Sequence, residues 1–94
     1  MTILHIEHKI QSFDGWKKLF DSDPINRKQS GVTHYRIYRP VDDPNYVIID
    51  LEFNTMQEAQ NTLAALQKVW GQMAGSIIES PQARILDVIE SEDL

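Results

Sequence analysis

Hydrophobic and polar positions alternate along the first ten residues of the chain. One side of this alternation carries Leu4, Ile6, His8 and Ile10. Because successive side chains of a β-strand point to opposite faces of a sheet, the pattern predicts a strand over residues 2–10. Three of the four side chains on this face are aliphatic, so we expect the face to be buried. His8 is therefore predicted to point into an apolar space.

Apolar residues that recur every three or four positions predict two main helices. The first follows Ser12, a residue type that caps helix N-termini, and its apolar stripe is Phe13, Trp16, Leu19 and Phe20. Asp23-Pro24 interrupts this stripe, so we expect a second short helical segment that is capped by Asp23 and ends at Gly31. The other main helix opens with the capping-box spacing of Thr55 and Glu58. Its stripe is Met56, Ala59, Leu63, Leu66 and Trp70.

Three further strands are predicted, over residues 32–39, 46–53 and 82–89. The first two flank residues 40–45, a cluster of turn-forming residues that favours an antiparallel hairpin. Pro81 is predicted to mark the entry to the last strand, after a mobile segment that ends near Ser80. The order strand, helix, strand, strand, helix, strand predicts one α+β domain over residues 1–94. It is typical of the ferredoxin-like βαββαβ fold, whose four-stranded antiparallel sheet carries both helices on one face.

A sheet of this kind leaves its other face uncovered. In this chain the uncovered face is predicted to mix charged residues with apolar ones, namely Ile3, Ile48, Leu86 and Val88. Because exposed apolar surface of that extent usually marks an interface, we expect a homodimer joined face to face.

The composition narrows the possible partners and compartments. The formal net charge of −5 argues against nucleic acid and against an anionic membrane surface, both of which favour basic patches. The chain has no cysteine, which excludes disulfides and cysteine-ligated metals and fits a reducing compartment. No segment has the pattern of a signal peptide or a membrane span. We therefore expect a soluble cytoplasmic protein.

The three histidines do not predict a metal site. His5 and His8 are an odd number of positions apart on a strand, so they face opposite sides of the sheet. His34 is expected on the same side as His5. No carboxylate cluster or helical histidine pair supplies the three or four convergent ligands that zinc requires. We expect neither a metal nor another cofactor.

His8 has two interpretations. As a functional group it is a general acid or base in an apolar cavity, because burial disfavours the imidazolium and leaves a neutral ring that accepts a proton near pH 7. As a structural group it is a core histidine whose two nitrogens are satisfied by a backbone carbonyl, by Tyr35 or by water. The residues alone leave both interpretations open.

Two other sets of residues also have two interpretations each. Trp16 and Trp70 are expected to face the sheet, either as core residues or as walls of a pocket for a planar aromatic ligand. Asp50 and Glu52 share the open face of the sheet. They form either a carboxylate pair for acid–base chemistry or part of a cross-strand or inter-subunit ion network, which is the interpretation we favour.

Several stretches of the sequence resemble a known group. Residues 6–10 read Ile-Glu-His-Lys-Ile and run into a segment with Phe13, Trp16 and Phe20, and a hairpin with Asp42-Asp43-Pro44-Asn45 follows. This resembles small bacterial proteins of the dimeric α+β barrel superfamily, which includes antibiotic biosynthesis monooxygenase-like domains. The resemblance covers residues 3–88.

The resemblance implies a ferredoxin-like protomer, a barrel formed by two sheets across a homodimer, and a ligand cavity between sheet and helices. It also implies that His8 lies on the cavity side, with Trp16, Tyr35 and Trp70 as walls. The residue set of the cofactor-independent monooxygenases is not matched here. The haem-degrading members require a histidine on the second main helix, and this helix has Asn61 but no histidine. A monooxygenase-like or cyclase-like reaction on a small aromatic compound is one expectation, and a non-catalytic dimeric module is the alternative.

Overall fold

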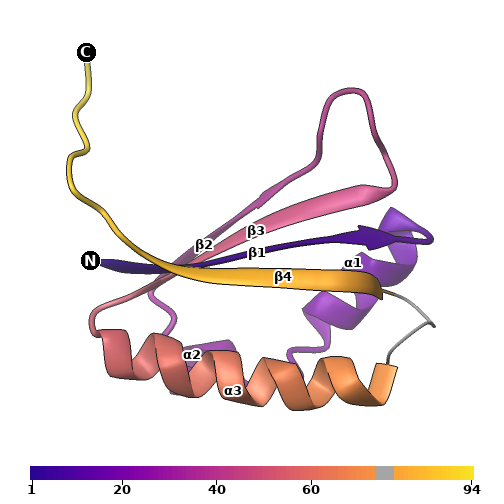
Figure 1. The fold of residues 1–94 in the computed structure, drawn as a ribbon, viewed down its shortest axis with the longest axis horizontal. Coiled ribbons are helices and arrows are strands. Elements are labelled where there is room, and N and C mark those ends of the chain that lie inside the picture. The colour runs from indigo at the N-terminus through magenta and orange to yellow at the C-terminus, as the bar shows by residue number, and fades with distance from the viewer. Residues whose placement is uncertain (74–77) are drawn as a thin grey trace.

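The computed structural model describes residues 1–73 and 78–94. Its elements are β1 (Thr2–Ile10), α1 (Phe13–Asp21), α2 (Arg27–Ser30), β2 (His34–Tyr38), β3 (Tyr46–Phe53), α3 (Met56–Met73) and β4 (Ile78–Asp87). The strands form one antiparallel sheet in the order β2-β3-β1-β4, and the helices lie on one face of it (Figure 1). The predicted ferredoxin-like α+β fold is confirmed.

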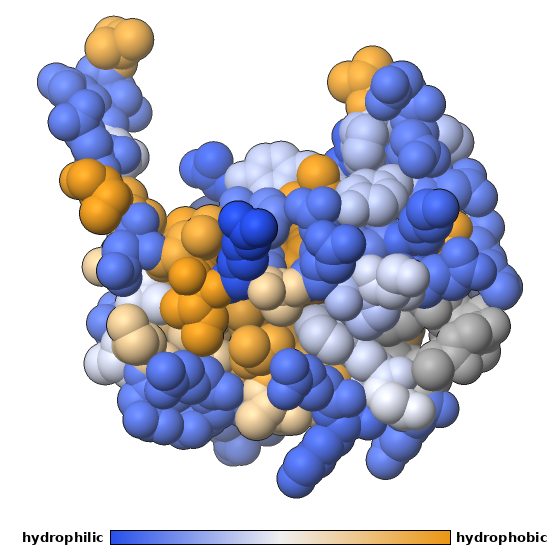
Figure 2. All heavy atoms as spheres, viewed as in Figure 1, coloured by the Kyte–Doolittle hydropathy of each residue, from blue (hydrophilic) through white to orange (hydrophobic). Residues whose placement is uncertain are grey.

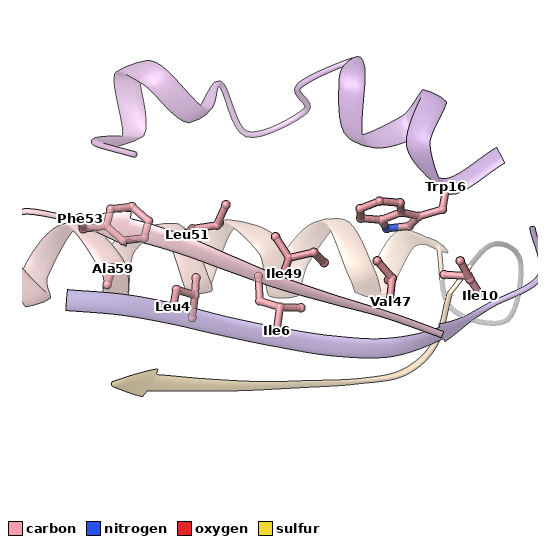
Figure 3. Packing of buried hydrophobic residues seen from close by; sticks show 9 residues of the cluster. All are labelled: Leu4, Ile6, Ile10, Trp16, Val47, Ile49, Leu51, Phe53 and Ala59. Carbon is pink, nitrogen blue, oxygen red and sulfur yellow. The ribbon is translucent and has the colours of Figure 1, made fainter. Parts of the chain in front are cut away.

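The core lies between the sheet and the helices. Strands β1 and β3 alternate between buried and partly exposed residues over nearly their whole lengths, as the sequence pattern predicts. Leu4 pairs with Leu51, Ile6 with Ile49 and His8 with Val47, so these side chains share the helix-facing side. Figure 3 shows the nine core residues, which are Leu4, Ile6, Ile10, Trp16, Val47, Ile49, Leu51, Phe53 and Ala59.

The helix caps follow the sequence signals in part. The Ser12 hydroxyl oxygen accepts the Gly15 N–H at 3.3 Å and caps α1, as predicted. The predicted Asp23 cap of α2 is wrong, because Asn26 occupies the cap position with a φ of 52°. Asp23 still accepts the N–H of Arg27 at 2.8 Å, so its carboxylate satisfies a helix-end donor from outside the cap position. Gly31, with a φ of 101°, ends α2 as predicted.

Helix α3 differs from its prediction at its first turn. The Glu58 N–H donates to the Thr55 hydroxyl at 3.2 Å, which is half of the predicted capping box. The Glu58 carboxylate accepts the same hydroxyl at 3.0 Å instead of reaching the Thr55 N–H. Met56 is half exposed, so its place on the buried stripe is wrong, and among residues 56–72 of this helix Ala59 and Thr62 are the fully buried ones. Trp70 is partly buried against the core.

The ends of two strands also differ from their predictions. The last strand begins at Ile78 rather than at Gln82 and ends at Asp87, and Pro81 lies inside it. Its pairing with β1 shifts between Glu7 and Lys9, and Ser80 nearby has a φ of 50°. Proline is tolerated at such a bulge because the ladder bond that it cannot donate is already interrupted.

The mobile segment predicted before this strand includes residues 74–77, which lie outside the described residues. Residues 78–80 belong to β4, so the predicted extension of that segment to Ser80 is wrong. Strand β2 spans His34–Tyr38 and is shorter than predicted. None of the helices that the structure describes is long and apolar enough to cross a membrane.

Candidate functional site

His8 lies on the helix-facing side of β1 and is 2% exposed. Its Nδ1 lies 3.1 Å from the carbonyl oxygen of Lys9. Because a carbonyl oxygen only accepts hydrogen bonds, Nδ1 carries the proton and Nε2 of the neutral ring carries the free lone pair. Burial lowers the pKa of His8, and the bond to Lys9 opposes that effect only partly. His8 is therefore a neutral, buried imidazole at pH 7.

A row of aromatic rings extends from His8 along α1. The rings of His8 and Trp16 have centroids 6.2 Å apart. Trp16 stacks on Phe20 with ring centroids 5.2 Å apart. The rings of Phe20 and Tyr35 meet in a T-shaped arrangement with centroids 5.1 Å apart. Trp16 and Phe20 are four positions apart on α1, so the helix itself aligns them over the sheet. The row places His8 at one end and Tyr35 at the other.

A cavity of about 70 Å³ lies beside this row, between the sheet and the helices. His8 lines it together with Ile6, Trp16, Leu19, Phe20, Pro24, Ile25, Arg27, Ile49, Leu51, Leu66, Val69 and Trp70. The lining is mainly apolar and aromatic, with His8 and Arg27 as its ionisable residues. A few polar groups in an apolar pocket are the usual composition of a small-molecule site.

The structure brings three of the four predicted site residues together. His8, Trp16 and Trp70 all line the cavity. Tyr35 is 42% exposed and lines a separate hollow outside the cavity. Its place in β2 opposite Leu51 keeps it on the helix-facing side of the sheet. Strand β3 lies between β2 and β1, the strand that carries His8.

Sequence reasoning missed Arg27 as a member of the site. Arg27 follows the Asp23-Pro24 interruption, in a segment that has no apolar period of its own. The available signal is Pro24, which lies just beyond the end of α1 and cannot continue a helix. The side chain of Arg27 then packs against Phe20, 3.9 Å from the ring centroid.

The opposite, open face of the sheet carries a chain of polar side chains. Tyr46 donates to Glu7 at 2.7 Å, and the other oxygen of Glu7 lies 2.9 Å from Nε2 of His5. Nδ1 of His5 lies 2.7 Å from Asp50, which also accepts the Tyr38 hydroxyl at 3.1 Å. This is the predicted cross-strand network, and it forms within one chain. Asp50 and Glu52 do not act as a pair, because Glu52 lies 3.7 Å from His34 instead.

The charges in this network follow from its contacts. Burial alone lowers the pKa of His5, but the hydrogen bonds to Glu7 and Asp50 outweigh it and raise the pKa above its usual range. Hydrogen bonds from Tyr46 and from His5 lower the pKa of Glu7. Because a carboxylate lies at each of its nitrogens, the pKa of His5 is shifted in the opposite direction from that of His8. Within residues 1–73 and 78–94, no group of three His, Asp or Glu side chains is arranged to hold a metal ion.

Solved structures with the same fold come from several bacteria. A candidate antibiotic biosynthesis monooxygenase from Deinococcus radiodurans superimposes with a TM-score of 0.78 at 12% identity, covering 100% of this chain and 98% of that one. SnoaB, a cofactor-independent oxygenase from Streptomyces nogalater, gives 0.75 at 8% identity, covering 96% and 94%. A dimeric ferredoxin-like protein from an uncultured marine organism gives 0.65 at 10% identity, covering 97% of each chain.

These likenesses extend over nearly the full length of the chain. No family model and no curated protein matches the sequence. At identities of 8–12% the likeness concerns the fold and not the chemistry of the site. The chain therefore has the ferredoxin-like fold of antibiotic biosynthesis monooxygenase-like proteins.

Proposed function

We propose that this chain is a cytoplasmic small-molecule enzyme or binding protein that takes a planar aromatic compound into the cavity beside His8. The observation that carries the proposal is a neutral imidazole in an aromatic-lined cavity, with its proton fixed on Nδ1 by Lys9. SnoaB, which shares the fold, is a cofactor-independent oxygenase. A monooxygenase-like or cyclase-like reaction on an aromatic compound fits this setting.

The chemistry assigned to His8 is acceptance of a proton or hydrogen bond at Nε2. A phenol whose ring stacks between Trp16 and Trp70 supplies such a proton from its hydroxyl. The apolar lining strengthens this hydrogen bond by excluding water. The lowered pKa of His8 keeps Nε2 unprotonated at pH 7, which is the state that a base requires.

The size of the cavity favours a second candidate function. A volume of about 70 Å³ is well below the 300–1,000 Å³ or so that is typical of ligand pockets. A ring-sized ligand therefore requires movement of side chains from α1 and α2. If these do not move, the chain is a non-catalytic dimeric module whose core fills its own pocket.

Binding of two matched one-ring compounds separates these functions. We expect 4-methylphenol to shift the indole N–H signals of Trp16 and Trp70 in a nitrogen-15 NMR titration. Because the hydroxyl donates to His8, it should bind about tenfold more tightly than 4-methylanisole, a difference of about 1.4 kcal/mol. In His8→Leu the two compounds should bind equally. Absence of any shift with either compound in the wild-type protein contradicts the proposal.

We also propose that the protein is a homodimer joined through the open face of the sheet. Tyr38 and Leu86 are each about 40% exposed on that face, and Ile3 pairs with Leu86 there. Figure 2 shows hydrophobic residues over β4, near the point where the C-terminal segment leaves it. The marine protein that shares this fold is described as dimeric, which supports a homodimer.

Sedimentation equilibrium at micromolar concentration tests the dimer. The wild-type protein should sediment at twice the chain mass, and Leu86→Glu should sediment at the chain mass, because a carboxylate at the centre of the interface loses its hydration without a partner. Lys17→Glu, on the solvent side of α1, is the matched control and should stay dimeric. A monomeric wild-type protein contradicts the proposed assembly.

A further inference from the structure

Arg27 faces two hollows at once. It lines the cavity of about 70 Å³ that also holds His8, which we call the inner cavity. It also lines a surface hollow of about 430 Å³, which we call the outer hollow, together with Asp23, Lys28, Val32, Thr33, His34 and Tyr35. The side chain of Arg27 therefore lies between the inner cavity and solvent.

The contacts of Arg27 hold its guanidinium at the end of the aromatic row furthest from His8. The guanidinium carbon lies 3.9 Å from the ring centroid of Phe20 and 5.2 Å from that of Tyr35. Nη1 donates to the carbonyl oxygen of Phe20 at 2.6 Å. Since Phe20 stacks on Trp16 and Trp16 lies against His8, the row spans the distance between the base and the guanidinium.

The outer hollow carries a local excess of positive charge in a chain whose net charge is −5. Two cationic side chains, Arg27 and Lys28, line the outer hollow. Among the described residues that line it, Asp23 has the one carboxylate. Asp23 already accepts the backbone N–H of Arg27 at 2.8 Å and lies 3.5 Å from its Nε. A guanidinium has five N–H donors in a planar fork, a shape that matches a carboxylate. This pattern suits an anionic oxygen group on a bound molecule.

We propose that Arg27 is the specificity-determining residue of the pocket, and that the pocket takes planar aromatic compounds bearing an anionic oxygen group such as a carboxylate. The inference rests on the proposed function, because it assumes that an aromatic ring enters the inner cavity. The ring stacks along Trp16 and Phe20, and its anionic group stays at the outer hollow, where Arg27 pairs with it. The group that reaches His8 is then the edge of the ring opposite the carboxylate.

Two isosteric compounds test this assignment. We expect the wild-type protein to bind 4-methylbenzoate about tenfold more tightly than 4-methylbenzamide, measured by the shift of the Trp16 and Trp70 indole signals. In Arg27→Gln the benzoate should lose that advantage, so that the two affinities become equal. The affinity for the amide should change little, which shows that the variant keeps its pocket. Arg27→Lys, which keeps the charge and loses the fork, should retain part of the preference.

Arg39→Gln is the matched control. Arg39 also lies over an aromatic ring, 4.8 Å from the centroid of Phe13, but it does not line either hollow. The Arg39→Gln substitution removes the same charge as Arg27→Gln and should leave the tenfold preference for the benzoate intact. Equal binding of benzoate and amide by the wild-type protein overturns the role of Arg27 and leaves the binding function standing. If the wild-type protein binds neither of these compounds but binds 4-methylphenol, the assignment to anionic compounds is wrong. If it binds none of the three, the proposed function fails as well.

Discussion

Trp16→Ala is expected to lower the free energy of unfolding by about 3–5 kcal/mol, which is the usual loss when a large buried aromatic side chain is truncated. Trp16 is 4% exposed and packs against His8, Phe13 and Phe20, so its removal leaves a cavity beneath α1 that the surrounding side chains fill only in part. The same truncation removes one wall of the proposed binding cavity. Chemical denaturation followed by far-ultraviolet circular dichroism measures the loss.

Trp70→Ala is the matched control for this prediction. Trp70 lines the same cavity but is only partly buried, so its truncation should lower the free energy of unfolding by clearly less than that of Trp16. A loss below about 1 kcal/mol for Trp16→Ala, the size of an ordinary point substitution, means that α1 is not held to the sheet through this ring. The aromatic row would then not be a fixed structural feature.

The second large effect is a dependence of the free energy of unfolding on pH. His8, on the buried face of the sheet, and His5, on the open face, contribute to it in opposite directions. The folded-state pKa of His8 lies below the 6.5 that is usual for histidine, so the unfolded chain binds more protons between these two pKa values. Stability from this residue is therefore lost as the pH falls below about 6.5 and until the folded pKa is reached. The loss amounts to about 1.4 kcal/mol for each unit by which the two pKa values differ.

His5 has the opposite sign. Its folded-state pKa lies above 6.5, so its stabilising effect is complete below that pH and is lost as the pH rises through the folded pKa. His8→Leu should thus remove an acid-induced loss of stability, and His5→Gln should remove a gain. Denaturation curves from pH 5 to 8 for the wild type and both variants measure the two slopes. Equal slopes for the wild type and His8→Leu contradict the burial of a neutral His8.

The alternation of β1 and β3 made the fold and the face of His8 predictable from the sequence. A period of two across Leu4, Ile6, His8 and Ile10 survives folding because one face of the sheet is buried, and a slip by one residue would expose every one of these side chains. The same parity correctly separated His5 from His8, and the structure places them on opposite faces, where the pKa of His5 is raised and that of His8 is lowered.

The features that the sequence did not reveal depend on tertiary contacts. Pro81 reads as a strand boundary, yet it lies within β4 because a register shift opposite Glu7 and Lys9 removes the need for its N–H. Tyr35 was predicted beside His8, but β2 is an edge strand and carries the ring to the outer hollow. Arg27 joins the site through stacking on Phe20, a contact seven positions away that no helical period indicates.

The central claim is that His8 offers an unprotonated Nε2 to a ligand in the inner cavity. Nitrogen-15 chemical shifts of the His8 ring at pH 7.5 test it directly, with and without saturating 4-methylphenol. We predict a neutral ring with its proton on Nδ1, as the bond to Lys9 requires, and a ligand-induced upfield shift of Nε2 as it accepts the hydroxyl. A ring protonated on Nε2, or an Nε2 signal unchanged by saturating ligand, would contradict the account.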